Sequence, residues 1–312
     1  MINIIVFIPI IAALLIGFVG SGKKISLLAS GANLILGVFI FFELIKTGGK
    51  EIIYESSFLI LETPNLALSF GVDGMSGILI LLTLVVTFCA VQVSPEKGPD
   101  GKEKLFHISS MLISAGALGA FGATDMFFMF AFHELALIPT FLMIAIYGHG
   151  RDKVAIAWKI TIYLGLGSLV LLGGLIALYS NLQGSGNPTF NIAELTDLAQ
   201  SHPISESLQK WIFLSVFLGF GILVSLFPFH SWAAPAYAAA PTPTAMLHAG
   251  VLKKFGLYGI IRIAMPMLPE GFAAWQGLIL VLLLGNILYV GFVTIAQSQL
   301  DTMLGNSSVM HM

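Results

Sequence analysis

The sequence predicts an all-α protein, a polytopic bundle of about 9–10 transmembrane helices whose seventh helix is broken. Three observations support this fold class. Of the 312 residues, 57% are hydrophobic and 10% are charged, whereas an average globular chain carries about 25% charged residues. The apolar residues fall in runs long enough to span a bilayer, which takes about 20 residues. One such run ends in a proline-rich stretch that no straight helix accommodates.

Ten apolar segments are expected to be spans. The first has no basic leader and no small-residue cleavage site, so it predicts a spanning helix and not a signal peptide. We expect a single transmembrane domain over 1–312, with N-terminal helices in 1–123, a functional half in 124–264 and a further, incomplete part in 265–312. The expected spans are 2–20, 26–45, 73–94, 105–123, 125–147, 154–180, 209–229, 244–264 and 274–296, with a tenth starting near 300. The segments 46–70 and 181–208 are expected to be loops.

The distribution of lysine and arginine between short loops predicts that the N-terminus lies outside the cytoplasm. In that orientation the outward side carries Lys46 and Lys50, with Lys210 at the edge of a span. The inward loops carry Lys23, Lys24, Lys97, Lys102, Lys104, Arg151 and Lys153.

The net charge of −2 gives no indication of a nucleic-acid partner. Cys89 is the single cysteine, so we expect neither a disulfide framework nor a cysteine metal site.

The break in the seventh helix is expected at 230–243. Proline removes a backbone donor and clashes with the preceding turn, and this stretch contains Pro235, Pro241 and Pro243, just after Pro228. Broken backbone at membrane depth is tolerated where protein buries it or water reaches it, and broken helices of this kind mark transport sites in many transporters. We therefore expect the functional residues to lie near this break.

Ionisable residues inside the spans are the candidate site residues, because a charge at the bilayer centre costs about 2.5–3.5 kcal/mol on insertion scales. Glu134 lies near the centre of the fifth span, and we expect it to be buried. Glu134 is either a functional proton-exchanging or ion-pairing carboxylate, or a protonated glutamate that is hydrogen-bonded in a contact between helices. Lys159 is either functional or a side chain that extends to the surface. Lys253 and Lys254 point about 100° apart on a helix, so at most one faces a given site.

Histidines near the break are further candidates, because histidine titrates in the physiological range. His230 and His248 flank the break. Each is explained equally well as a buried, hydrogen-bonded histidine and as a proton-relay residue.

Asp73 and Asp125 begin the third and fifth spans. Acidic residues at a helix N-terminus favour the helix dipole, so both are interpreted first as helix caps.

Several sequence motifs together resemble the antiporter-like membrane subunits of respiratory complex I, and among them subunit M, also called chain 4. The resemblance covers most of the chain. The matching motifs are GVDGMS at 71–76, FHELALIP at 132–139, AWKITIY at 157–163, PFHSW at 228–232, AAPTP at 239–243, HAGVLKKFGLYGIIR at 248–262 and SSVMHM at 307–312.

The resemblance implies proton translocation driven by quinone reduction elsewhere in an NADH–quinone oxidoreductase. It implies that this chain binds no cofactor, neither NADH nor flavin, and that its partners are other complex I membrane subunits in a bacterial cytoplasmic membrane. The implied proton-transfer residues are Glu134, Lys159, His230 and Lys254. Lys253, His248 and His133 are secondary candidates, and no metal site is expected.

Two departures from the family pattern affect this expectation. The family places a lysine in the seventh span where this chain has Leu223, and there is no lysine between Trp211 and His230. The family fold also has about fourteen spans in two inverted repeats, so this chain is expected to be a fragment or a shortened gene product that stops after the first repeat. Asp301 and Thr302 stand where the family has basic residues. Two alternatives stay open: a subunit of a cation/proton antiporter or membrane-bound hydrogenase, and a non-pumping structural subunit.

Overall fold

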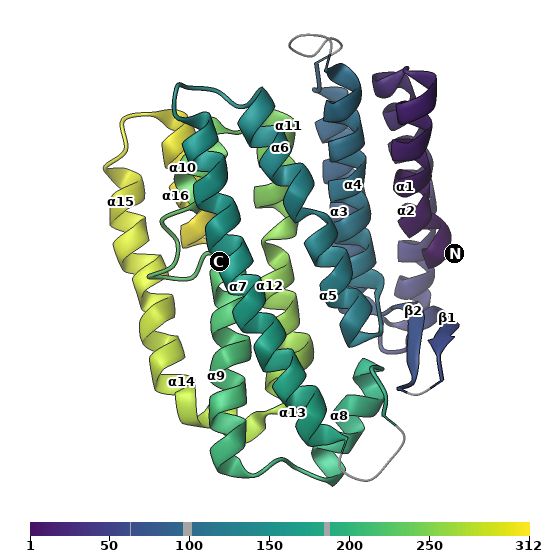
Figure 1. The fold of residues 1–312 in the computed structure, drawn as a ribbon, viewed down its shortest axis with the longest axis vertical. Coiled ribbons are helices and arrows are strands. Elements are labelled where there is room, and N and C mark those ends of the chain that lie inside the picture. The colour runs from purple at the N-terminus through teal and green to yellow at the C-terminus, as the bar shows by residue number, and fades with distance from the viewer. Residues whose placement is uncertain (63, 96–101, 184–187) are drawn as a thin grey trace. The chain divides into compact units, whose positions relative to one another are not determined.

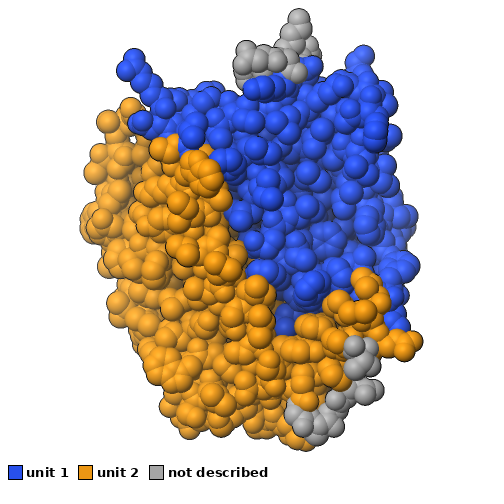
Figure 2. Space-filling view, in the orientation of Figure 1, with its two compact units in different colours: residues 1–59, 67–154, 240–252 blue, residues 60–66, 155–239, 253–312 orange. Residues whose placement is uncertain are grey.

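Helices make up most of the computed structural model, which describes residues 1–62, 64–95, 102–183 and 188–312. The described residues divide into two compact units that alternate along the chain (Figure 2). Unit 1 comprises 1–59, 67–154 and 240–252, and unit 2 comprises 60–66, 155–239 and 253–312. The division of the chain into the parts 1–123, 124–264 and 265–312, which the sequence suggested, stays a prediction.

Eight helices in the described part of the chain are long and apolar enough to cross a membrane, which confirms the predicted all-α polytopic fold. They are Ile2–Val19, Gly22–Thr47, Gly74–Gln92, Glu103–Gly122, Met126–Tyr147, Lys153–Leu182, Glu206–Leu223 and Pro269–Ile295. The count is lower than nine or ten for two reasons. The predicted span 244–264 consists of short helical pieces, and the segment that begins near 300 is the eleven-residue helix α16.

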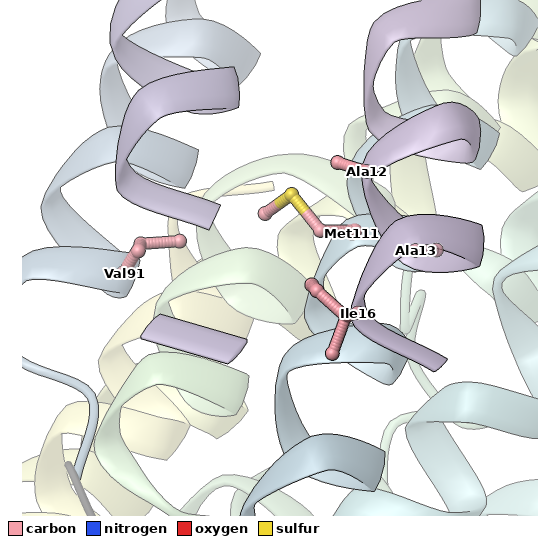
Figure 3. Packing of buried hydrophobic residues seen from close by; sticks show 5 residues of the cluster. All are labelled: Ala12, Ala13, Ile16, Val91 and Met111. Carbon is pink, nitrogen blue, oxygen red and sulfur yellow. The ribbon is translucent and has the colours of Figure 1, made fainter. Parts of the chain in front are cut away.

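Unit 1 is built around helix α4, whose small side chains allow close packing on several sides. It contacts α1, α2, α3, α5, α6 and α11. The helices of unit 1 are α1 (Ile2–Val19), α2 (Gly22–Thr47), α3 (Gly74–Gln92), α4 (Glu103–Gly122), α5 (Met126–Leu135), α6 (Leu137–Tyr147), α11 (Thr242–Leu247) and the π-helix η2 (His248–Leu252) (Figure 1). Figure 3 shows part of its core, where Ala12, Ala13 and Ile16 of α1 meet Val91 of α3 and Met111 of α4.

Two glycines set how closely α4 approaches α5. A Cβ added to Gly116 would lie 2.6 Å from the carbonyl oxygen of Phe132, and one added to Gly119 would lie 2.2 Å from the Phe132 ring. Because neither position has room for a side chain, the backbone next to Glu134 is held against α4. Glycine at such contacts is typical of membrane helices.

Unit 2 contains the broken helix and the C-terminal elements. Its long helices are α7 (Lys153–Leu182), whose first two residues belong to unit 1, α9 (Glu206–Leu223) and α14 (Pro269–Leu284). The shorter elements are α8 (Ile192–Ser201), α10 (Ala233–Ala239), α12 (Lys254–Gly259), η3 (Ile260–Ala264), α13 (Met265–Met267), η4 (Gly285–Val290), α15 (Gly291–Ile295) and α16 (Leu300–Met310). The π-helices among the described residues, η2 of unit 1 and η3 and η4 of unit 2, all follow Leu247 in the sequence. This geometry is often found at functional sites.

Both predicted loops contain regular structure that the sequence analysis missed. Strands β1 (Ile53–Leu61) and β2 (Leu66–Val72) form a two-stranded sheet that begins in the predicted loop 46–70 and ends two residues beyond it. The amphipathic helix α8 lies within 181–208, and the side chain of Asn191 caps it by accepting from the N–H groups of Ala193 and Glu194. A strand needs a pairing partner, which the local pattern of a short segment does not reveal.

The break in the seventh helix begins earlier than the predicted 230–243. Helix α9 ends at Leu223, residues 224–232 are not helical, and α10 then runs to Ala239 before a second interruption at 240–241. Pro228 disfavours helix in the residues before it. Pro235 and Pro243, by contrast, lie in the first turns of α10 and α11, where a missing N–H leaves no helical bond unmade.

Candidate functional site

Glu134 and His133 form a hydrogen-bonded pair in the last turn of α5. His133 Nδ1 lies 3.1 Å from Glu134 Oε1. The His133 side chain is 10% exposed and the Glu134 side chain 30%, so Glu134 is half-buried and not fully buried as predicted. The neighbouring histidine, a secondary candidate in the sequence, is the buried member because it occupies the helix face turned toward the interior of unit 1.

The helix changes direction immediately after this pair. Helix α5 ends at Leu135 and α6 begins at Leu137. Pro139 has no N–H to donate to the carbonyl of Leu135, so the helical ladder is interrupted there. The Thr140 N–H and hydroxyl both donate to the carbonyl of Ala136, at 3.1 and 2.8 Å. The kink therefore places the ionisable pair beside irregular backbone in the middle of a predicted span.

The two aspartates interpreted as helix caps are caps in the structure. Asp73 forms a capping box with Ser76 at the start of α3. Asp125 accepts from the N–H groups of Phe127 and Phe128 at 2.9 and 3.0 Å. Asp125 precedes the span and is 2% exposed, and burial raises its pKa to about 6 against the opposing effect of these hydrogen bonds.

The broken backbone of unit 2 is held by polar side chains from two other helices. Lys159 of α7 donates from Nζ to the carbonyl of Ser231 at 2.9 Å, and the Tyr163 hydroxyl lies 3.1 Å from the Ser231 hydroxyl. Asn286 of η4 accepts from the Phe227 N–H at 2.7 Å. Unpaired backbone groups in a membrane interior cost several kcal/mol each, so these contacts stabilise the break.

His230 lies within the same break, next to the residue that Lys159 contacts. Its ring stacks on Phe227 with 5.6 Å between centroids and meets the Tyr289 ring edge-on at 5.9 Å. The structure thus brings Lys159 and His230 to one non-helical segment. Lys159 itself is exposed, and both alternatives for it, a functional lysine and a side chain that extends to the surface, stay predictions.

The adjacent lysines have different surroundings. Lys254 is half-buried at the start of α12. Lys253 is 1% exposed: its Nζ donates to the carbonyl of Ser308 in α16 and lies 5.7 Å from the centroid of the Tyr237 ring. The two side chains therefore differ in burial, and Lys253 is the more buried of the pair. His248, at the start of η2 in unit 1, is buried.

Several residues at the break were not singled out in the sequence. Asn286 is a polar residue inside the apolar run 274–296, which is a signal that could have identified it. Tyr163 and Ser231 lie within or beside motifs that were recognised. Ser308 contributes only a backbone carbonyl, which no sequence pattern marks. Among the described residues no group of three histidine, cysteine, aspartate or glutamate side chains is arranged to hold a metal ion.

Comparison with known proteins gives consistent matches. A sequence model described as "NADH:quinone oxidoreductase/Mrp antiporter, TM" matches residues 123–312. The chain is 31% identical to NAD(P)H-quinone oxidoreductase chain 4 3 of Picosynechococcus over 317 residues, covering 99% of this chain and 55% of that protein. It is 30% identical to NADH-quinone oxidoreductase subunit 13 of Thermus thermophilus, covering 100% of this chain and 62% of that one.

Solved structures match over the same extent. A chain of respiratory complex I from Thermus thermophilus with bound NADH superposes with a TM-score of 0.85 at 28% identity, covering 100% of this chain and 62% of that chain. A chain of an archaeal membrane-bound sulfane sulfur reductase gives 0.86 at 22% identity, which is a likeness of fold. The chain spans about half the length of the curated relatives it matches.

Proposed function

We propose that this chain, which belongs to the NADH:quinone oxidoreductase/Mrp antiporter transmembrane family, translocates protons as a membrane subunit of an NADH–quinone oxidoreductase. Its relatives named as NAD(P)H-quinone oxidoreductase chain 4 and subunit 13 support this assignment. The observation that carries it is the pair of Glu134 and His133, 3.1 Å apart in a kinked membrane helix. Its partners are other membrane subunits of that complex.

The chemistry of the pair is a reversible proton transfer. A proton on the Glu134 carboxyl moves to His133 Nδ1, which leaves a carboxylate and an imidazolium in contact. Imidazole titrates near neutral pH, and a base within hydrogen-bonding reach of the acid meets the geometric requirement for transfer. The imidazolium then releases its proton onward, and the pair is ready to accept another. Lys159, His230 and Lys254 are the further proton-transfer residues of this proposal, with Lys253 and His248 as secondary candidates.

The test uses the assembled complex in inverted membrane vesicles. Quinone reduction and vesicle acidification are measured together in the parent and in Glu134→Gln. We expect Glu134→Gln to lower acidification severalfold at an unchanged or smaller rate of quinone reduction. The matched control is Glu43→Gln, which removes a carboxylate that pairs with Lys46 near the end of α2 and is expected to leave acidification at the parental level. Parental acidification in Glu134→Gln would refute the role of the pair.

His133 has its own variant. His133→Phe keeps a ring of similar size at a buried position and removes the titrating nitrogen. We expect the acidification rate to fall severalfold, because the Glu134 carboxyl loses the nitrogen that lies 3.1 Å from it. A parental acidification rate would show that Glu134 exchanges protons without His133.

One observation favours a second candidate function, that of a non-pumping structural subunit. Leu223 is 2% exposed at the end of α9 and takes the position at which the resembled subunits carry a lysine. In that case Glu134→Gln changes neither quinone reduction nor acidification, while loss of the chain prevents assembly of the complex.

The family description also includes Mrp antiporters. Dependence of acidification on a sodium gradient, without quinone reduction, would identify cation/proton antiport.

A further inference from the structure

A pocket lies where helices α9 and α14 begin, within unit 2. Its volume is about 540 Å³, and it is lined by Glu206, Ser207, Lys210, Trp211 and Trp275. Both helices are among those long enough to cross a membrane, and the lining residues come from their first two turns. The pocket therefore lies at the level where a spanning helix passes from the hydrocarbon to the headgroup layer.

The two helix starts are fixed side by side by four polar atoms and a glycine. The Trp275 indole N–H donates to the carbonyl of Lys210 at 2.9 Å. The Gln209 side-chain oxygen accepts from the Glu270 N–H at 3.1 Å. A Cβ added to Gly271 would lie 2.6 Å from the carbonyl oxygen of Gln209. Because these contacts hold the Trp275 ring in place, the pocket is preorganised.

The lining offers one cation, one anion and two aromatic faces. Lys210 Nζ lies 2.7 Å from Glu206 Oε1, with side chains 41% and 65% exposed. The Trp211 and Trp275 rings meet at 6.3 Å between centroids, and Trp211 is 66% exposed. Tryptophan is enriched at membrane interfaces, and its ring face attracts an ammonium ion. The Ser207 hydroxyl is an additional donor.

We propose that this pocket binds the headgroup of a zwitterionic phospholipid with a primary ammonium, such as phosphatidylethanolamine. Lys210 and Ser207 hold the phosphate, while Glu206 and the tryptophan faces hold the ammonium. The headgroup aligns its two charges antiparallel to those of the Glu206–Lys210 pair. The acyl chains extend toward the hydrocarbon along α9 and α14, where Leu278 and Val281 are exposed.

The charge of the lining decides against an anionic lipid. The pocket residues carry one positive and one negative side chain, so their sum is zero. A headgroup with a phosphate alone would satisfy Lys210 but leave Glu206 beside a second negative charge. A choline headgroup carries a cation for the tryptophan faces, but its methylated nitrogen has no N–H to donate to Glu206. The ethanolamine headgroup satisfies both charged side chains.

The experiment measures lipid retention by native mass spectrometry on the purified full chain after delipidation. Phosphatidylethanolamine, phosphatidylcholine and phosphatidylglycerol with identical acyl chains are added at equal concentration. We expect one phosphatidylethanolamine to be retained at least about fivefold more tightly than either competitor, since the N–H bond to the Glu206 carboxylate, which neither competitor can make with an ammonium, contributes about tenfold or more in affinity. We expect Trp275→Phe, which loses the indole N–H, and Glu206→Gln each to remove this preference.

Two matched controls distinguish a specific pocket from general lipid contact. Trp158→Phe changes another exposed tryptophan, on α7. Glu43→Gln breaks another surface ion pair, also 2.7 Å long. Both are expected to keep the phosphatidylethanolamine preference. Equal retention of the three lipids by the parent, a preference for phosphatidylglycerol, or equal losses in the control and pocket variants would each overturn the proposal. None of these outcomes depends on proton transport, so the proposed function is tested separately.

Discussion

Lys253 donates from its ammonium group to the backbone carbonyl of Ser308, which ties the residue immediately before α12 to helix α16. The same ammonium lies 5.7 Å from the centroid of the Tyr237 ring in α10. Helices α10 and α16 also pack closely, because a Cβ on Gly305 would lie 2.9 Å from the Cα of Ala234. One buried side chain thus contacts the two helices that pack together next to the break.

Lys253→Met is expected to loosen α16. Methionine keeps the length of the side chain but removes the donor to the Ser308 carbonyl, and a hydrogen bond to a charged group contributes about 1.5–3 kcal/mol. Global stability is a poor readout, because the variant also relieves the cost of a buried charge. We therefore expect hydrogen exchange over 300–310 to speed up about tenfold or more. Lys254→Met is the control, and equal exchange in both variants would contradict the role of Lys253.

The sequence predicted that Lys253 and Lys254 point in different directions, but not which of the two is buried. The 100° between adjacent helix positions predicted that Lys253 and Lys254 face different surroundings. It did not indicate which one is buried, because that depends on α10 and α16, which lie elsewhere in the sequence. The family resemblance identified Lys254, whereas the packing of unit 2 buries Lys253.

Gly116→Ala is expected to destabilise unit 1. A methyl group at this position would lie 2.6 Å from the Phe132 carbonyl oxygen and 3.2 Å from the Ala136 Cβ, so α4 and α5 must separate next to Glu134. Overpacking of this kind costs about 1–3 kcal/mol, which we expect to appear as a lower midpoint of thermal unfolding in detergent. Gly173→Ala on α7, where nothing lies within 4 Å, should leave the midpoint unchanged or raise it.

Features that depend on local sequence were predictable, and those that depend on distant partners were not. Asp73 and Asp125 were identified as caps because a cap acts within one helical turn. The helix break followed from the prolines, although its start at residue 224 was missed because Pro228 affects the residues before it. The sheet of β1 and β2 and the bond from Phe227 to Asn286 join segments by pairing, which single-segment patterns do not encode.

Asn286→Leu is expected to weaken the broken segment of unit 2. Leucine has a similar size and no acceptor, so the Phe227 N–H loses its partner at 2.7 Å. A buried donor left without an acceptor costs about 1–3 kcal/mol. We expect faster hydrogen exchange in 224–232 and a lower unfolding midpoint. Asn181→Leu removes an exposed amide that bonds within its own helix and should change neither quantity. Parental exchange in Asn286→Leu would show that another group supports the break.

The carboxyl of Asp125 makes the stability of unit 1 depend on pH. Folding raises its pKa from 3.8 to about 6, because burial disfavours the carboxylate more than the backbone hydrogen bonds from Phe128, Phe127 and Ala67 favour it. A raised pKa means that the folded state binds the proton more tightly than the unfolded state does. The side chain therefore costs no stability below about pH 4, and the unfolding free energy falls as the pH rises from about 4 to about 6, by up to about 3 kcal/mol.

Asp125→Asn keeps an oxygen that accepts from the same two N–H groups and removes the ionisation. We expect the variant to match the parent near pH 4 and to become more stable than the parent by up to about 3 kcal/mol at pH 7. Thermal unfolding midpoints in detergent at pH 4, 5, 6 and 7 measure the difference. A constant difference for Asp125→Asn would mean that the buried cap stays charged throughout, and that its hydrogen bonds outweigh its burial.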